Sequence, residues 1–243
     1  MRAAMGPCPD GMTPSLPQPL WQDEHLGVVV KAAGLLSVPG RGPDKQDCLS
    51  LRLAQAGLPS LVVHRLDQAT SGLMLFARTN AMQRQLSQAF AQRQVHKQYL
   101  ACVHGHLPAS RDWQTIDAPI AADWPRRPLR TVSDSGQSSQ TLWRCLGHSP
   151  ASGSTAGDKS YLALRPLSGR THQLRVHLQH IGHPICGDAL YAPAEWVMPG
   201  QGLMLHAQRL GVTHPQTGQA LDFEDLPAWF PADLMPALKA LPC

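Results

Sequence analysis

The sequence predicts an α+β protein whose mixed, mostly antiparallel sheet is flanked by a few helices. Three observations lead to this fold class. Apolar, β-branched runs typical of strands outnumber the amphipathic helical patterns, the two kinds of segment do not alternate regularly, and no internal repeat divides the chain. A doubly wound parallel sheet would require regular alternation of strands and helices, so the pattern disfavours it.

The chain of 243 residues is long enough for one large domain or two small ones, at roughly 150 residues per domain. Residues 1–20 contain five prolines and show no hydrophobic periodicity. Because such a segment can neither pair as a central strand nor bury an apolar face, we expect a flexible leader. Composition does not shift again afterwards, so we expect residues 21–243 to form a single domain.

Two short apolar runs in the first half, residues 26–32 and 72–77, are typical of buried strands. Residues 49–56 between them fit a short helix that Gly57 ends. The clearest helix follows residue 78, where Thr79 or Asn80 can cap the first turn.

Three apolar residues of that helix recur at i, i+4 and i+8, namely Met82, Leu86 and Phe90. This spacing places one apolar stripe against the sheet.

Three strand-like segments occupy the second half, at residues 96–103, 141–146 and 160–167. The Gly- and Ser-rich stretch 149–158 lies close to two of them, which indicates a hairpin loop rather than a domain linker. Residues 172–181 form a further helix candidate, with Leu174, Leu178 and Ile181 on one face and Gly182 as its end.

The charge balance permits an acidic partner without requiring one. The net charge is +4, and the 21 basic residues comprise 16 Arg and 5 Lys. An excess of arginine suits bidentate phosphate recognition, but a genomic bias would produce the same excess.

Neither the cysteines nor the hydropathy indicate export or a membrane. The six cysteines form no C-x-x-C pair, which disfavours a zinc ribbon and a disulfide-rich secreted scaffold and favours reduced thiols. No window reaches the approximately 18 apolar residues of a membrane span. We therefore expect a cytoplasmic protein.

Polar residues concentrate in three segments, 64–72, 97–99 and 169–177. Taken singly, Asp67 fits a turn or a cap, Tyr99 a half-buried strand aromatic, and Arg175 a surface ion pair. Four closely spaced histidines lack the H-E-x-x-H pattern of a zinc site, so we expect no metal. The motifs of serine hydrolases and of nucleotide-binding loops are also absent from the sequence.

Several of these segments together resemble the RluA family of pseudouridine synthases. The run at 64–78 (HRLDQATSGLMLFAR) is similar to the defining motif of the family, and 170–188 (RTHQLRVHLQHIGHPICGD) is similar to its second signature. Residues 97–101 (KQYLA) and 205–207 (LHA) match two further elements. The resemblance covers about residues 21–230 and implies the pseudouridine synthase catalytic fold for the domain 21–243.

The resemblance implies a cofactor-free isomerase that breaks the N1–C1′ bond of a uridine in RNA, turns the base and rejoins it through C5. Asp67 matches the essential aspartate of the family, which acts either as a nucleophile or as a base toward the ribose, and the sequence leaves both roles open. Arg175 matches the arginine that pairs with this aspartate. A nearby cation is physically required to keep a carboxylate ionised in a dry pocket.

Other matched residues concern the base and the RNA. Tyr99 matches the tyrosine that stacks on the target base, and Leu174 matches an apolar residue on the opposite side of the pocket. Arg65 resembles the residue that enters the space vacated by the flipped nucleotide. His64 and Arg170, which belong to the two main motifs, are further candidates for RNA binding.

The sequence also departs from the family pattern. Residues 31–34 (KAAG) stand where the family has K-P-x-G, and Cys186 replaces an aliphatic residue. Because residues 1–20 are too short for an S4-type RNA-binding domain, we expect RNA specificity to reside in the catalytic domain.

Within the family, the segments 34–40 and 123–128 resemble members that modify both 23S rRNA at position 746 and tRNA at position 32. Arg126 and Arg127 beside Trp124 form a basic and aromatic loop that can follow phosphates, although a solvated loop is the alternative. We expect a monomer that binds structured RNA and no membrane. The remaining alternatives are a member that acts on tRNA only and a catalytically idle RNA-binding module.

Overall fold

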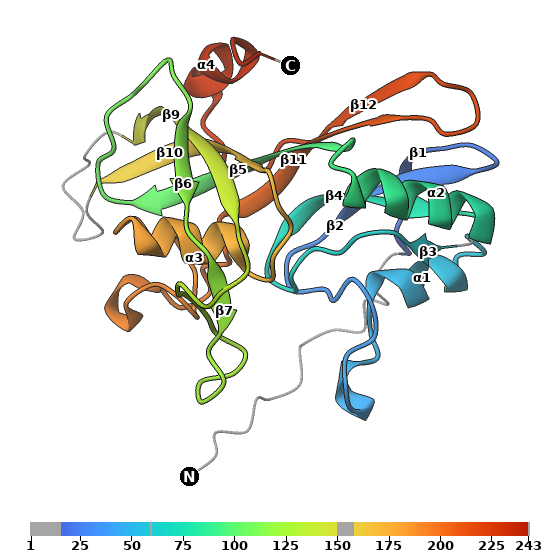
Figure 1. Ribbon diagram of the computed structural model, residues 1–243, viewed down its shortest axis with the longest axis horizontal. Helices are drawn as coiled ribbons and strands as arrows, with labels where there is room; N and C mark the ends of the chain where they lie inside the picture. Colours follow the sequence, from blue (N-terminus) through green and yellow to red (C-terminus); the bar gives the residue numbers. More distant parts are fainter. Residues whose placement is uncertain (1–15, 59, 150–157, 243) are drawn as a thin grey trace.

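One ten-stranded mixed sheet organises the chain in the computed structural model, which describes residues 16–58, 60–149 and 158–242 (Figure 1). The strand order is β1-β2-β4-β11-β5-β10-β9-β6, while β3 pairs with β4 and β12 pairs with β11. Within the described residues, the pairs of this sheet are antiparallel except for β4 with β11. The α+β class predicted from the sequence is confirmed.

The strands of the large sheet have the following bounds: β1 (Pro19–Gln22), β2 (Leu26–Lys31), β3 (Leu61–Val62), β4 (Ser71–Ala77), β5 (His96–His104), β6 (Gln114–Asp117), β9 (Gln140–Ser149), β10 (Lys159–Pro166), β11 (Leu205–Thr213) and β12 (Ala220–Glu224). A separate hairpin consists of β7 (Ile120–Ala122) and β8 (Arg130–Val132). The α-helices are α1 (Leu49–Gln55), α2 (Asn80–Ala91), α3 (Gln173–His180) and α4 (Met235–Lys239). Single 3-10 turns occur at Pro43–Lys45, Ala194–Trp196 and Ala232–Leu234.

The strands predicted at 26–32, 72–77, 96–103, 141–146 and 160–167 correspond to β2, β4, β5, β9 and β10, and the three predicted helices correspond to α1, α2 and α3. The side chain of Thr79 caps α2 by accepting a hydrogen bond from the Met82 N–H at 3.2 Å. Gly57 and Gly182 follow α1 and α3 with φ of 74° and 83°, the left-handed conformation expected at helix ends.

The predicted end of the leader at residue 20 differs from the structure. Strand β1 begins at Pro19, so the last two residues of the predicted leader 1–20 belong to the sheet. Proline is tolerated there because β1 lies at the edge of the sheet, where a missing N–H need not cost a ladder bond. Residues 1–15 of the leader and residues 150–157 of the predicted hairpin loop lie outside the described residues.

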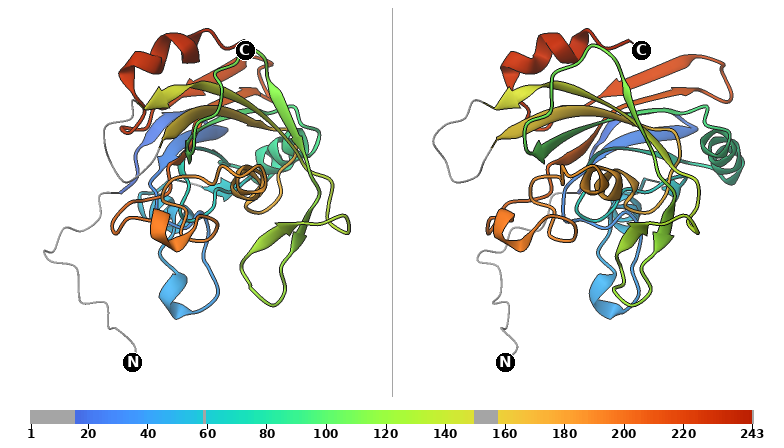
Figure 2. Two further views of the ribbon diagram at one scale, coloured as in Figure 1. Left: turned by 90° about the vertical axis from the view of Figure 1, so that its left-hand side faces the viewer. Right: turned by 60° about the vertical axis from the view of Figure 1, so that its left-hand side comes forward.

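Helices cover both faces of the sheet. Leu49 and Leu53 of α1 pack against Val29 and Met74, and α3 packs on the same face through the neighbouring cluster that contains Leu174. The opposite face is covered by α2 at one end, where side chains of β12 join the same cluster, and by α4 at the other. Figure 2 shows α3 and α4 on opposite sides of the sheet. The face that carries α1 and α3 therefore has a seam between two separately packed halves.

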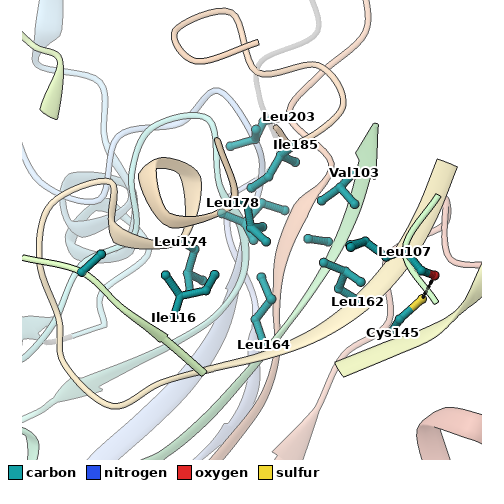
Figure 3. Packing of buried hydrophobic residues seen from close by; sticks show 13 residues of the cluster. Val103, Leu107, Ile116, Cys145, Leu162, Leu164, Leu174, Leu178, Ile185 and Leu203 are labelled. Atoms are coloured by element: carbon teal, nitrogen blue, oxygen red, sulfur yellow. Dashed lines mark hydrogen bonds between the residues drawn. The ribbon is translucent and has the colours of Figure 1, made fainter. Parts of the chain in front are cut away.

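The largest core cluster fixes α3 on the sheet. Leu174 and Leu178 of α3 point at apolar side chains from β5, β9 and β10, among them Val103 and Leu162, and at Ile185 (Figure 3). Leu178 and Ile185 have no exposed surface, and Leu174 is 7% exposed. Burying a leucine side chain contributes about 2 kcal/mol. This packing gives the first turn of α3 a fixed position beside Tyr99, which contacts the same cluster.

Strands β4 and β11 approach each other unusually closely at Gly72. Its φ is +113°, and a Cβ at this position would lie 2.4 Å from the carbonyl oxygen of Ala207 and 2.5 Å from its nitrogen. Backbone atoms cannot move away without disturbing the parallel pairing of Ala207 with Gly72. Only glycine satisfies both the conformation and the contact.

We therefore predict that Gly72→Ala destabilises the fold by at least about 2 kcal/mol, because it combines a left-handed alanine with a backbone clash. Urea unfolding measures this loss. Gly202→Ala is the matched control, since a Cβ there meets no atom within 4 Å and φ is not in the left-handed region. Equal stability of the two variants would contradict the prediction.

Candidate functional site

The loop that precedes β4 carries Asp67 and is tied down on both sides of it. The Ser37 hydroxyl donates to the Leu66 carbonyl at 2.7 Å and accepts from the Leu66 N–H at 3.1 Å. The Gly34 N–H donates to the Gln68 carbonyl at 2.8 Å. The Asp67 side chain keeps 27% of its surface exposed. A rigid backbone thus presents a carboxylate that solvent or a ligand can still reach.

A buried lysine supports the same loop from below. Lys31 has no exposed surface, and its Nζ donates to the carbonyls of Ala32 at 2.9 Å, Leu35 at 2.7 Å and Gln68 at 3.2 Å. Burial lowers the pKa of Lys31 to about 8, and the negative charge of Asp67 opposes this shift. In the sequence this lysine is evident only as part of the K-A-A-G turn, because its three acceptors are backbone atoms that no motif reveals.

Arg175 lies in α3, and its guanidinium interacts with two aspartates, Asp188 and Asp67. Nε and Nη2 donate to the two carboxylate oxygens of Asp188 at 2.8 and 2.6 Å, and Nη1 lies 3.8 Å from Oδ2 of Asp67. The Asp188 side chain is fully buried, and its Oδ1 also accepts from the N–H groups of Leu190 and Tyr191. Burial would lower the pKa of Arg175, but Asp188 holds it above the ordinary value.

This arrangement refines the expectation for Arg175. The sequence predicts a pair with Asp67, and the structure adds Asp188 as the partner with the shorter, bidentate contact. Asp188 is the last residue of the second motif, so the motif contains this buried carboxylate partner, but its sequence pattern does not reveal the pairing.

His172 and Tyr191 complete the wall behind Asp67. The Tyr191 hydroxyl accepts from the Arg130 N–H at 3.0 Å and forms a hydrogen bond of 2.7 Å with His172 Nδ1. Nε2 of His172 lies 4.0 Å from Oδ2 of Asp67. Burial lowers the pKa of His172, and the charge of Asp67 opposes that shift. In the sequence, His172 is one of the four closely spaced histidines, and no pattern places it beside Asp67.

Tyr99 stands at the seam between the two halves of the sheet face. Its ring is half-buried and contacts the core clusters of both α1 and α3. Burial raises the pKa of Tyr99, and the negative charge of Asp67 raises it further, so the phenol stays protonated at neutral pH. Leu174 in the first turn of α3 faces the same space.

A cleft of about 1210 Å³ joins these side chains, and its lining includes Asp67, Tyr99, Leu174 and Arg175. Its volume leaves room for a ligand larger than a single flat ring.

Three further predicted residues line this cleft, and they differ in how freely they can meet a ligand. His64 stacks on Phe90 with centroids 4.5 Å apart, and its Nε2 accepts from the Leu75 N–H at 2.9 Å. Burial lowers the pKa of His64 to about 3, so this ring is neutral. Arg65 and Arg170 are exposed, and Nε of Arg170 donates to the Ser138 carbonyl at 3.3 Å.

Arg126 and Arg127 lie outside this cleft, at the turn of the β7–β8 hairpin. Arg126 donates to the Asp123 carboxylate at 2.7 Å, and the Arg127 guanidinium lies 3.7 Å from the centroid of the Trp124 ring. Trp124 is 66% exposed. The structure thus separates the predicted basic loop from the residues that surround Asp67.

Within the described residues, no group of three or more His, Cys, Asp and Glu side chains is arranged to hold a metal ion. The same part of the chain contains no helix whose length and hydropathy would allow it to span a bilayer.

Comparisons with known proteins agree with this geometry. The profile of the RNA pseudouridylate synthase family matches residues 25–180. The dual-specificity RNA pseudouridine synthase RluA of Yersinia pestis is 43% identical over 206 residues, which cover 84% of this chain and 96% of the relative. The protein of that name from Escherichia coli strain K12 is 40% identical over 206 residues and covers 84% and 90%.

Two solved structures are also similar. Human RNA pseudouridylate synthase domain containing 1 superimposes with a TM-score of 0.75 at 26% identity, over 96% of this chain and 98% of that chain. Human RNA pseudouridylate synthase domain containing 4 has a TM-score of 0.66 at 24% identity over 91% of each chain, which is a likeness of fold.

We predict that Asp188→Asn lowers the free energy of unfolding by about 3 kcal/mol, because it leaves the buried guanidinium of Arg175 with one distant carboxylate. Asp222→Asn is the control, since Asp222 pairs with Arg209 but its side chain is 47% exposed, and such a pair contributes less than about 1 kcal/mol. Urea unfolding of both variants measures the difference. Losses of the same size would contradict a special role of the buried pair.

A second prediction concerns pH. Because the pKa of Lys31 is about 8 in the folded chain and 10.5 ordinarily, the unfolded chain binds more protons between these values. Lys31 therefore makes the free energy of unfolding rise with pH across this window. Wild type should gain stability relative to Lys31→Met from pH 8 to pH 10.5, as measured by urea unfolding. The exposed Lys45→Met should show no such trend, and a pH-independent difference for Lys31→Met would refute the shift.

Proposed function

The chain belongs to the RNA pseudouridylate synthase family, and on this premise we propose that it isomerises uridines in two RNAs, 23S rRNA at position 746 and tRNA at position 32. The observation that carries the proposal is the carboxylate of Asp67 beside the guanidinium of Arg175, 3.8 Å away, in a cleft walled by Tyr99 and Leu174. The two RluA relatives, which are named for dual specificity, support the choice of two RNAs.

The proposed reaction exchanges one bond of the uridine for another. The N1–C1′ bond breaks, a C5–C1′ bond forms, the proton on C5 leaves and N1 gains a proton. Asp67 acts on the ribose, either as a nucleophile at the sugar carbon or as a base. Its exposed oxygen surface and its separation from Arg175 suit both roles, because neither oxygen is occupied by a close hydrogen bond from the guanidinium.

Tyr99 and Leu174 hold the base in this proposal. A target uridine within a stem is out of reach of Asp67, so the nucleotide must turn out of the helix into the cleft. The Tyr99 ring then stacks on the uracil, a contact that contributes about 1–3 kcal/mol per base.

Contacts to the rest of the RNA come from the cleft rim and from the β7–β8 hairpin. Arg65 is exposed two residues before Asp67 and fits the space that the flipped nucleotide leaves. Arg170 offers a further charge at the rim, whereas the neutral, stacked His64 shapes the wall. Arg126, Arg127 and the exposed Trp124 provide a second surface for phosphates and an unstacked base.

The proposal includes a cytoplasmic monomer that needs no cofactor. Two alternatives remain distinct from it, an enzyme that acts on tRNA only and an idle module that binds RNA without isomerising it. The retention of Asp67, Tyr99 and Arg175 around one cleft argues against the idle module.

Tritium release from RNA labelled at uridine C5 tests the function. A tRNA anticodon stem-loop and a 23S rRNA fragment around position 746 are assayed in parallel, and we expect release from both. Release from the tRNA fragment alone would support the narrower alternative. An absence of release from both fragments and from bulk cellular RNA would overturn the proposed activity.

We further predict that Asp67→Asn abolishes tritium release, with a loss of at least about 1,000-fold, while affinity for the same RNA changes less than about threefold. The amide keeps the shape of the side chain but can neither attack the ribose nor accept its proton. Filter binding measures the affinity, and Asp44→Asn on the exposed turn at 43–45 serves as the control. Activity that survives in Asp67→Asn would refute the assigned role.

A further inference from the structure

The cleft continues well beyond the residues around Asp67. Past Tyr99 its lining follows β5 and β11 to the end of α2 and includes four more basic residues and one acidic residue: Arg93, Lys97, Arg165, Arg209 and Asp222. Arg165 and Arg209 have protein partners, Gln98 for the first and Asp222 for the second. Among the described residues, no such partner is found for the side chains of Arg93 and Lys97.

Arg93 has a backbone conformation that favours a different residue. It follows the last turn of α2, where its N–H donates to the Phe90 carbonyl at 3.1 Å and the next N–H, of Gln94, donates to the Ala89 carbonyl at 2.9 Å. Its φ is +59°, the left-handed position that glycine normally occupies at the end of a helix. An arginine there costs folding free energy that a glycine would not.

The place of this strained residue is informative. Within the described residues, the non-glycine residues with positive φ are Arg93 and His172, and both line the cleft. His172 stands beside Asp67, at the reacting end. Strained conformations concentrate at functional sites. The strained backbone of Arg93 therefore marks the other end of the same cleft as a candidate binding site.

Lys97 stands next to Arg93 without a countercharge. It precedes Tyr99 by two residues on β5, so both side chains face the cleft. Both side chains line the same cleft. Burial lowers the pKa of Lys97, and the positive charge of Arg93 lowers it further. In the part of the chain that the structure describes, neither side chain makes an ion pair or hydrogen bond. Two neighbouring cations without a carboxylate form a site for an anion.

We propose that Arg93 and Lys97 bind backbone phosphate of the substrate RNA, at the end of the cleft away from Asp67. This inference rests on the proposed function for the identity of the ligand. The guanidinium of Arg93 can contact two phosphate oxygens at once, and the half-buried ammonium of Lys97 supplies a point charge beside it. Together with the β7–β8 hairpin, the pair gives the RNA two separate backbone contacts on either side of the flipped nucleotide's pocket.

Replacement of Arg93 by glycine separates this role from a structural one. In Arg93→Gly the left-handed position gains its preferred residue, so the melting temperature should stay the same or rise. Binding to the tRNA anticodon stem-loop should weaken about three- to tenfold. The slope of log affinity against log salt concentration should fall by about one, the signature of a lost phosphate contact. KM should change more than kcat, because the lost contact does not involve the reacting atoms.

Arg84→Ala is the matched control. Arg84 lies on α2, the helix that precedes Arg93, and its side chain is exposed and does not line the cleft. It removes the same charge but should leave the salt slope at the wild-type value. Lys97→Met, which keeps the apolar stem, should lower the slope in the same way as Arg93→Gly. Wild-type affinity and slope in both Arg93→Gly and Lys97→Met, or an equal fall in Arg84→Ala, would overturn the proposal.

The outcome remains distinguishable from a failure of the proposed function. Tritium release by wild type tests the isomerase, whereas the salt slopes test the phosphate site with the same RNA. An inactive wild type whose slope falls in Arg93→Gly would retain the phosphate site and discard the activity. An active wild type with unchanged slopes would give the opposite result, and a wild type that binds neither RNA would overturn both.

Discussion

The bidentate pair of Arg175 with Asp188 is the interaction on which the site depends. Asp188 engages two nitrogens of the guanidinium and is itself held by two backbone N–H groups, so the third nitrogen can point in only one direction. That nitrogen faces Asp67 from 3.8 Å, which is within electrostatic reach but beyond hydrogen-bond distance. If Arg175 instead bound Asp67 through both oxygens, the carboxylate would lose the freedom that a nucleophile or base needs. The buried second aspartate thus lets the cation attract Asp67 without occupying it.

The fold places this arrangement at a seam. Helices α1 and α3 pack on the same face of one sheet in separate clusters, and Tyr99 is the aromatic side chain that contacts both. The loop of Asp67 belongs to the α1 half, where Lys31 and Ser37 hold it, while Arg175 and Leu174 belong to α3. The two halves are joined through the close parallel contact of Gly72 with Ala207, only a few residues from Asp67. Strand packing together with the contacts that hold the Asp67 loop therefore sets the distance between Asp67 and Arg175.

The sequence predicts the parts of this fold whose pattern is local. Strands β2 and β4 are continuous apolar runs, and α2 has both a capping threonine and an apolar stripe. Strands β1, β6 and β12 are short edge or near-edge strands in which exposed residues interrupt the apolar ones, so periodicity does not reveal them.

The sequence pattern does not predict the central strand β11 either, for a different reason. His206 and Gln208 are buried in it, where they meet Ser71 and Gln98 from neighbouring strands. Buried polar residues that satisfy each other across the sheet look like surface residues in a single sequence. The same limit applies to Lys31 and Asp188, whose partners are backbone atoms or distant in sequence, whereas Asp67, Tyr99 and Arg175 are found through the motifs that contain them.

A net charge of +4 says little about where RNA would bind, because the relevant charges are local. Apart from Arg65 and Arg170 at the rim, the Arg and Lys side chains along the cleft fall into two classes. Arg175, Arg165 and Arg209 are held by protein partners and shape the cleft, whereas Arg93 and Lys97 face it without a carboxylate partner among the described residues. A cation that is already paired gains little from a phosphate, while an unpaired cation next to a second one gains from any anion that relieves their repulsion. The distribution of partners, more than the number of basic residues, therefore bears on which part of the cleft would hold a nucleic acid backbone in the proposed function.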